Sequence, residues 1–157
     1  MKILLTGATG YIGKRLLSVL VRNGHQVVCL VRDAGRLNFP EAFRKDVAVV
    51  EGDLLRPETL LNVPTDIDGA YYLVHSMSSS DDYRKLEEAS AANFRQAMQR
   101  TAVRHVIYLG GIVNESELSE HLLSRKNVET ELAKGSYHFT AFRAGIIDRK
   151  STRLNSS

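Results

Sequence analysis

The sequence has a single cysteine, Cys29, among 157 residues, and therefore cannot form an internal disulfide. This excludes the class of small disulfide-stabilised domains. Because Cys29 lies in an apolar run, we expect a buried structural thiol. Long apolar runs are also lacking: none approaches the ~20 residues of a membrane-spanning helix, so we expect no membrane span. The apolar start of the chain is too short for a signal peptide, and a cytoplasmic location is the default expectation.

The sequence also lacks a large excess of either basic or acidic residues. The chain has 21 basic and 18 acidic residues, and residues 148–157 supply three of the basic and one of the acidic residues. The preceding residues hold 18 basic and 17 acidic residues, so the net charge falls from +3 to +1 without the last ten. A nucleic-acid-binding protein needs a concentrated basic surface, and we therefore expect no nucleic-acid partner. The five histidines lack metal-ligand spacing, which argues against a metal site.

What the sequence does contain is a regular alternation of short apolar runs and amphipathic stretches. The runs predict strands at residues 2–6, 26–31, 47–51, 70–74, 105–109 and 138–146. The amphipathic stretches predict helices at residues 11–23, 83–101 and 119–134, with a short helix opened by Pro57. This alternation predicts an α/β fold, a Rossmann-like doubly wound parallel sheet of six strands in a three-layer αβα arrangement. Its ligand crevice is expected at the carboxyl ends of the first and fourth strands.

The turn between the first predicted strand and the first predicted helix reads Thr-Gly-Ala-Thr-Gly-Tyr-Ile-Gly, residues 6–13. Gly7 permits a tight turn, Gly10 lets phosphate oxygens approach the backbone, and Gly13 lets the helix pack closely on the strand. The free N–H groups at the start of the helix would then face a pyrophosphate. A strand before the motif and a helix after it are the context that this motif requires. We therefore predict a dinucleotide site that includes Thr6, Gly7, Thr9, Gly10, Tyr11, Ile12 and Gly13.

The end of the second predicted strand reads Leu-Val-Arg-Asp at residues 30–33. NAD sites carry an acidic residue at this place, which accepts hydrogen bonds from the ribose hydroxyls. Arg32 can instead pair with a 2′-phosphate through its planar guanidinium, and Asp33 is expected to point elsewhere. The sequence thus favours NADP(H) over NAD(H) as cofactor. The alternative is that Arg32 is a solvated surface charge.

Several strings resemble the atypical short-chain dehydrogenase/reductases, which include the NmrA-like proteins. The glycine motif is the first, and the others are similar to a bacterial subgroup that carries this NAD(P)-binding domain ahead of a C-terminal domain of uncharacterised function. These strings are Tyr-Tyr-Leu-Val-His-Ser-Met at residues 71–77, Ala-Ala-Asn-Phe at 91–94, Ile-Tyr-Leu-Gly-Gly-Ile at 107–112, Ser-Arg at 124–125, Val-Glu at 128–129 and Phe-Arg-Ala-Gly at 142–145.

The resemblance, which covers residues 1–147, implies roles for further residues. Arg32 would meet the 2′-phosphate. Asp53 would contact the adenine, with Leu54 beside it. The residues that would border the ribose and the nicotinamide are Val74, His75 and Ser76. Asn93 matches the family asparagine on the long helix.

One departure from the family pattern concerns catalysis. Reductases of this superfamily usually carry Tyr-x-x-x-Lys on the helix after the fifth strand, and alignment puts His121 at the tyrosine position and Arg125 at the lysine position. The serine that usually ends the fifth strand is replaced by Gly110 and Gly111. His121 could donate a proton or could be a surface residue, and Arg125 keeps its proton near neutrality but can bind a ribose.

Two functions follow as hypotheses. The first is an NADPH-dependent oxidoreductase acting on an unknown small-molecule substrate, with the cofactor performing the chemistry. The second is a non-catalytic NADP(H)-binding redox sensor or assembly factor, which the lost Tyr/Lys pair favours. Sugar-nucleotide epimerisation is a weaker third hypothesis, because it needs the same tyrosine.

Other polar and aromatic groups are interpreted as structural. Tyr72 and Tyr108 alternate with aliphatic residues in predicted strands, which indicates core positions. The segment at residues 86–89, which contains Glu87 and Glu88, is interpreted as a solvated helix face.

The last ten residues, 148–157, are polar and follow a strand pattern without a turn signal. They correspond codon by codon to a translated sequencing adapter. We therefore expect residues 1–147 to be an NAD(P)-binding domain that continued past Ile147 in the native protein, and residues 148–157 to be a non-native tail.

Deletion of residues 148–157 should leave the melting temperature unchanged within error. After Ile147 the one apolar residue is Leu154, so the tail cannot bury enough surface to offset the ~1–2 kcal/mol of backbone entropy per ordered residue. Thermal unfolding of the two chains, followed by circular dichroism, measures this. A sizeable loss of stability on deletion would identify the tail as native sequence.

Overall fold

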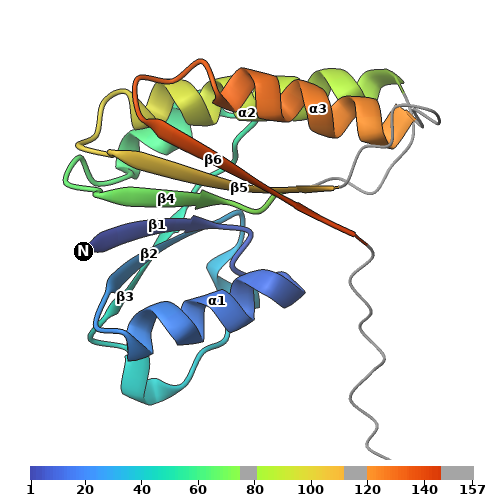
Figure 1. Cartoon of the computed structure of the whole chain (residues 1–157). Helices are drawn as coiled ribbons and strands as arrows, with labels where there is room; N and C mark the ends of the chain where they lie inside the picture. The colour runs from blue at the N-terminus through green and yellow to red at the C-terminus, as the bar shows by residue number, and fades with distance from the viewer. Residues whose placement is uncertain (75–80, 112–119, 146–157) are drawn as a thin grey trace, which may run out of the picture.

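The computed structural model describes residues 1–74, 81–111 and 120–145. Within them, six strands form one parallel sheet in the order β3-β2-β1-β4-β5-β6 (Figure 1). The strands are β1 (Lys2–Thr6), β2 (Gln26–Val31), β3 (Val47–Glu51), β4 (Gly69–Tyr72), β5 (His105–Gly111) and β6 (His138–Ala144). The chain winds outward from β1 in one direction and, after β3, returns to β4 and winds outward in the other. This confirms the predicted doubly wound sheet.

Helices cover both faces of the sheet (Figure 1). Helix α1 (Tyr11–Arg22) lies on the face of β1, β2 and β3, and α2 (Asp81–Met98) and α3 (Glu120–Leu132) lie side by side on the opposite face. The short 3-10 helices are η1 (Ala34–Arg36), η2 (Glu41–Phe43) and η3 (Pro57–Asn62). In the described ranges, no helix is both long enough and apolar enough to cross a membrane.

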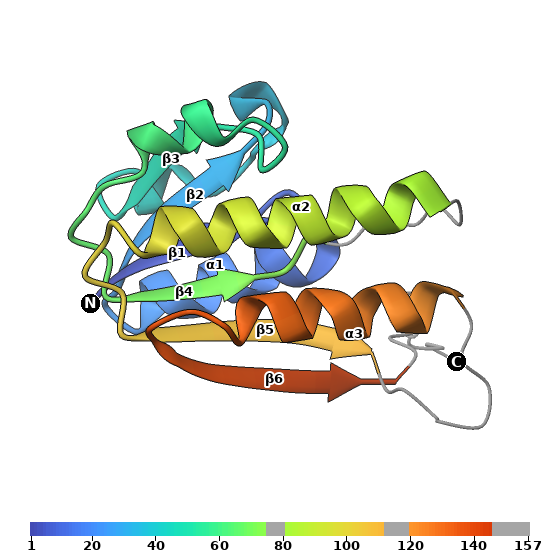
Figure 2. The same ribbon diagram turned by 90° about the horizontal axis from the view of Figure 1, so that it is seen from above.

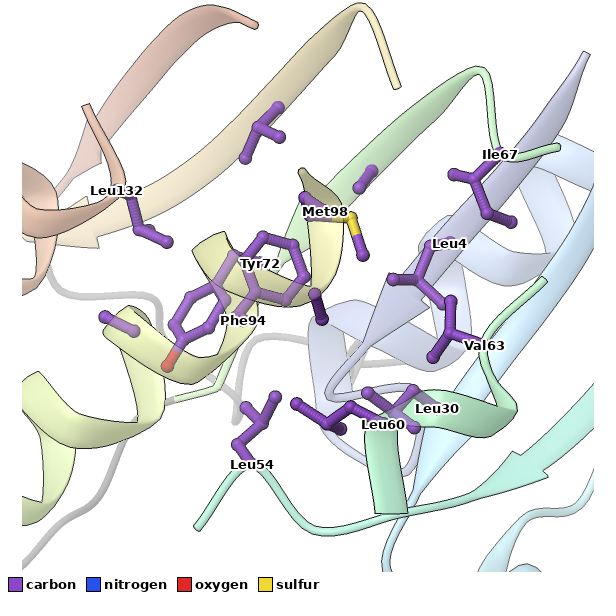
Figure 3. Close-up of a cluster of buried hydrophobic side chains, with 14 of the residues drawn as sticks. Leu4, Leu30, Leu54, Leu60, Val63, Ile67, Tyr72, Phe94, Met98 and Leu132 are labelled. Atoms are coloured by element: carbon purple, nitrogen blue, oxygen red, sulfur yellow. The ribbon is translucent and has the colours of Figure 1, made fainter. Parts of the chain in front are cut away.

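Alternate residues of the strands enter two separate cores. On β1, Leu4 packs toward α2 and η3, whereas Ile3 and Leu5 pack toward α1. Figure 3 shows the first core, in which the rings of Tyr72 and Phe94 meet edge to face at 5.0 Å between centroids. A strand covered on both faces must be apolar throughout, which is why the central strands read as continuous apolar runs.

The second core contains Cys29, which is fully buried. Burial raises the pKa of its thiol to about 12, because the thiolate would lose its hydration there. The thiol therefore stays protonated and unreactive near neutrality, and the prediction of a structural cysteine is confirmed.

Some boundaries differ from the predicted ones by a few residues. β4 ends at Tyr72 and not at Val74, because the Leu73 N–H donates to Thr6 Oγ1 at 3.1 Å and so leaves the strand ladder. Helix α2 ends at Met98, before the predicted residue 101, and Thr101 closes this end by donating from its hydroxyl to the Met98 carbonyl at 2.8 Å. In both cases a hydroxyl takes a backbone partner that a regular element would have used.

Two glycines of the first βαβ unit are needed for different reasons. Gly24 follows the end of α1 with φ of +77°, and the N–H groups of Gly24 and His25 donate to the Val21 and Leu20 carbonyls. This is a Schellman ending, which favours glycine. Gly13 has no positive φ but no room for a side chain, because a Cβ there would overlap the Gly7 carbonyl oxygen and lie 2.8 Å from Ala8 Cα.

Replacing each of these two glycines with alanine should show whether steric crowding or backbone strain lowers the unfolding free energy more. Gly13→Ala should cost about 2–3 kcal/mol of unfolding free energy, because α1 must move away from β1 even though alanine favours helices by about 1 kcal/mol. Gly24→Ala should cost about 1 kcal/mol, since its Cβ meets nothing within 4 Å and only the left-handed backbone opposes it. Urea unfolding of both variants measures this, and equal costs would contradict the crowding at Gly13.

Candidate functional site

A cavity of about 400 Å³ opens at the carboxyl ends of β1 and β4. Residues 6–10 form one wall, residues 30–32 and 52–55 a second, and residues 72–74 a third. The fourth wall comes from α2, through Tyr83, Leu86, Glu87 and Ser90. This is the crevice that the sequence predicts, because strand order reverses between β1 and β4.

The glycine turn between β1 and α1 is closed against neighbouring backbone and presents no side chain at its glycines. Gly7 has φ of +70°, and a Cβ on it would lie 2.9 Å from the Leu73 carbonyl oxygen. The Gly10 N–H donates to the Gly7 carbonyl at 2.9 Å, and a Cβ on Gly10 would lie 3.2 Å from that oxygen. Such a turn lets a large anion reach the backbone directly.

The start of α1 supplies the positive end of this wall. Gly10 is the N-cap, and no side chain of the described residues caps the helix or places an acidic group in its first turn. The N–H groups of Tyr11, Ile12 and Gly13 are therefore left for a ligand, and the helix dipole favours an anionic one. These three residues lie behind the cavity lining, where the Tyr11 ring packs under the Arg15 guanidinium at 3.9 Å.

A cationic side chain stands at the end of β2. Arg32 is exposed and lines the cavity. Asp33 does not line it, because its Oδ1 accepts a hydrogen bond from the Gly35 N–H at 2.9 Å and caps η1. The expected divergence of these two neighbouring side chains is confirmed.

The loop after β3 carries Asp53 and Leu54 into the second wall. Asp53 Oδ1 accepts a hydrogen bond from the Leu55 N–H at 3.0 Å, and the Asp53 N–H donates to Thr59 Oγ1 at 2.9 Å. The Asn93 side-chain amide donates to the Leu54 carbonyl at 2.7 Å. Asn93 thus lies behind the wall and fixes the loop that forms it.

Thr6 joins the ends of β1 and β4. Its fully buried hydroxyl donates to the Tyr71 carbonyl and accepts from the Leu73 N–H, both at 3.1 Å. Val74 follows on the cavity wall. His75 and Ser76, which the sequence also assigns to this side, lie outside the described residues.

The two residues that align with the catalytic Tyr/Lys pair, His121 and Arg125, both lie in α3. The structure describes the side chain of Arg125 but not that of His121. Arg125 is half-buried, and a Cβ on Gly111 would lie 3.3 Å from its Cδ. The Tyr108 hydroxyl donates to the Arg125 carbonyl at 3.3 Å. Arg125 thus packs against the end of β5, beside the cavity and not in its lining.

Tyr72 and Tyr108 are core residues, as predicted, with 1% and 0% exposure. Burial is the main reason that the pKa of each phenol lies well above its usual value, and the charge of Glu87 raises both further. Both phenols therefore stay neutral at physiological pH.

The interpretation of residues 86–89 as a solvated helix face is wrong for Glu87 and Glu88. Both are half-buried between α2 and α3, where Glu87 accepts a hydrogen bond from the Ser124 hydroxyl and Glu88 accepts one from the Asn127 amide. The sequence analysis did not predict that α2 forms a wall of the cavity. Its residues Tyr83, Leu86, Glu87 and Ser90 recur at three- and four-residue spacing, which is the signal of one helix face.

Among the described residues, no group of three His, Cys, Asp or Glu side chains could hold a metal ion. The cavity instead combines exposed backbone, a helix N-terminus and an arginine with apolar residues from β2 and β4. That combination suits a large organic phosphate with an aromatic base.

Comparison with known proteins agrees with this geometry. A family described as NAD(P)H-binding matches residues 7–150. The chain belongs to this NAD(P)H-binding family. The cavity therefore lies in an NAD(P)H-binding domain, at the turn where its family motif begins.

The chain is also similar to individual proteins with different activities. It is 27% identical over 148 residues to the photosystem II assembly factor Ycf39 of Trieres chinensis, covering 91% of this chain and 45% of that protein. It is 28% identical over 111 residues to the 2-alkyl-3-oxoalkanoate reductase of Stenotrophomonas maltophilia, covering 69% and 32%. The chain thus spans less than half the length of these relatives.

Solved structures confirm the fold. The Citrobacter sp. triphenylmethane reductase complexed with NADP(H) superposes with a TM-score of 0.72 at 22% identity, over 90% of this chain and 48% of that one. The yeast methylglyoxal/isovaleraldehyde reductase complexed with NADPH superposes with a TM-score of 0.78 at 13% identity, over 92% and 58%. At these identities the likeness establishes the Rossmann-like architecture.

Gly10→Val should abolish cofactor binding and leave most of the helical circular dichroism. The branched side chain would fill the space between the glycine turn and the pyrophosphate. Fluorescence titration with NADPH measures the loss, and Gly10→Ala, with a smaller side chain, should lose less affinity. Unchanged NADPH affinity in Gly10→Val would show that the glycine turn is only structural.

Proposed function

We propose that this domain binds NADP(H) in preference to NAD(H) and serves an NADPH-dependent oxidoreductase of the atypical short-chain dehydrogenase/reductase kind, acting on a small molecule. In this proposal residues 1–147 are the cofactor domain and residues 148–157 lie outside it. The observation that carries the cofactor preference is the pair of side chains that follows β2. Arg32 lines the cavity, and the neighbouring Asp33 caps η1.

The wall near Arg32 suits a phosphate better than a pair of ribose hydroxyls. An acidic side chain there would accept hydrogen bonds from the 2′- and 3′-hydroxyls of NAD. The Asp33 carboxylate turns toward the Gly35 N–H and away from the cavity, whereas Arg32 lines the cavity, where its planar guanidinium can pair with a 2′-phosphate. Solved structures of this fold hold NADP(H) or NADPH in two cases and NAD⁺ in another, so the preference rests on Arg32 and Asp33 and not on the fold.

In this proposal each residue of the site either binds the cofactor or positions a residue that does. When bound, the cofactor supplies hydride transfer. The α1 N-terminus and the glycine turn hold the pyrophosphate, Asp53 and Leu54 border the adenine, and Val74 borders the nicotinamide side. Asn93 keeps the Leu54 segment in place through its hydrogen bond to the Leu54 carbonyl.

The second candidate function is a non-catalytic NADP(H)-binding sensor or assembly factor. The observation that favours it lies at the end of β5, where Gly110 and Gly111 stand in place of a hydroxyl-bearing residue and Arg125 packs against Gly111. A site without the usual serine, tyrosine and lysine has lost the groups that protonate a substrate carbonyl. One relative with a similar sequence bears the name of an assembly factor. The missing tyrosine also makes sugar-nucleotide epimerisation a weaker third candidate.

NADPH oxidation by the full-length protein discriminates between the two candidates. The decrease in NADPH absorbance is followed with a panel of acceptors, quinones first and then small carbonyl compounds. An oxidoreductase should consume NADPH with at least one acceptor in proportion to enzyme concentration. NADPH binding without turnover on the whole panel would favour the sensor.

Arg32→Ala should weaken NADPH binding about tenfold or more, because it removes a charge-assisted hydrogen bond worth roughly 1.5–3 kcal/mol. NADH binding should change little, since NADH has no 2′-phosphate. Titration of both cofactors on the full-length protein measures this. Arg36→Ala is the matched control, because Arg36 is an exposed arginine of η1 that lies outside the cavity wall. Equal losses for the two cofactors would reject Arg32 as the reader of the 2′-phosphate.

A further inference from the structure

Helix α2 contributes an acidic residue, Glu87, to the cavity lining. Its hydrogen bond from the Ser124 hydroxyl ties it to α3, which connects β5 to β6. Asn93, six residues later on the same helix, contacts Leu54 in the loop after β3. On α2, Glu87 therefore faces α3, on the side of β5, and Asn93 faces the loop after β3.

The position of Glu87 relates it to one half of a bound dinucleotide. A doubly wound sheet holds the pyrophosphate where strand order reverses, with one nucleotide over each half of the sheet. Arg32 and Asp53 follow β2 and β3, so the adenosine half belongs on their side. The nicotinamide half then belongs over β4 and β5. Figure 2 shows that α2 begins beyond the carboxyl end of β4, and Glu87 lies in this first part of the helix.

The carboxylate is held in a partly water-excluded wall. Ser124 is 7% exposed, and the buried hydroxyls of Tyr72 and Tyr108 lie close enough to Glu87 for its charge to act on both phenols. Charges in such a wall are screened less than charges on an open surface. Arg125 is a cation on the same side, and its charge partly offsets the burial that raises the pKa of Tyr108; it packs against Gly111 and does not line the cavity.

The charge of the wall matters because the two redox forms of the cofactor differ in charge. The oxidised nicotinamide ring carries a positive charge, and the reduced ring is neutral. A fixed carboxylate nearby stabilises the cation and leaves the neutral ring almost unaffected. We propose that Glu87 sets the redox preference of the site by strengthening the binding of NADP⁺ relative to NADPH. This inference rests on the proposed NADP(H) function and adds to it a residue that makes the domain respond to the NADP⁺/NADPH ratio.

The test compares the dissociation constants of NADP⁺ and NADPH for the wild type, Glu87→Gln and Glu88→Gln. Glutamine at position 87 removes the charge and keeps an oxygen that can accept from Ser124. The affinity for NADP⁺ relative to NADPH should fall about threefold to tenfold in Glu87→Gln. Glu88→Gln is the matched control: it removes the next carboxylate on the helix, which binds Asn127 and lies outside the cavity wall. Its ratio should stay within about twofold of the wild-type ratio.

Adenosine 2′,5′-bisphosphate, which has no nicotinamide, separates this inference from the proposed function. It should bind the wild type and Glu87→Gln equally. If the wild type binds neither this nucleotide nor NADPH, the proposed function itself is overturned. If both bind and the NADP⁺/NADPH ratio is the same in Glu87→Gln as in the wild type, only the role of Glu87 is overturned. Weaker binding of the bisphosphate to Glu87→Gln would also overturn it, because the substitution would then act on the fold of the wall.

Discussion

The close approach of α1 and its glycine turn to the ends of β1 and β4 is the constraint on which the rest of the site depends. Gly13 lies so close to Gly7 that no side chain fits between them, and a Cβ on Gly7 would lie 2.9 Å from the Leu73 carbonyl oxygen. Thr6 completes the junction through its hydrogen bonds to Tyr71 in β4 and to Leu73 just after it. Because backbone meets backbone here, the start of α1 points into the cavity at a fixed angle, and its N–H groups form a rigid anion site.

The other walls of the cavity carry charges of different sign on either side of the α1 N-terminus. In the proposed function Arg32 stands beside the adenosine half and the start of α1 faces the pyrophosphate, whereas Glu87 stands on the side of β5. NADP carries negative charges at its 2′-phosphate end and at the pyrophosphate in the middle, and in its oxidised form a positive charge on the nicotinamide ring at the other end. Under these two proposals the order of charges along the cavity would match the order of charges along oxidised NADP, which would join cofactor choice and redox preference in one electrostatic arrangement.

The end of β5 explains why a cofactor site of this quality does not by itself imply a reductase. Gly110 and Gly111 provide no hydroxyl, and the Arg125 side chain takes the space beside Gly111. Arginine remains charged near neutrality and cannot act as lysine does toward a tyrosine. The binding part of the site and the proton-transfer part are thus built from different elements, and a Rossmann-like fold can keep the first when the second is altered.

The sequence by itself determined the alternation of strands and helices, the doubly wound sheet, the glycine turn and the opposite roles of Arg32 and Asp33. The elements, the turn and the directions of these two side chains depend on residues within one strand, one helix or one turn, and the sheet follows from the regular alternation of strands and helices. Only the tertiary structure decided that Glu87 faces the cavity and not solvent, that Asn93 supports Leu54 from 39 residues away, and that Thr6 ends β4 early. The physical reason is that helical periodicity fixes which residues of α2 share a face, whereas the packing of α2 on η3 and α3 decides which face meets the cavity and which meets water.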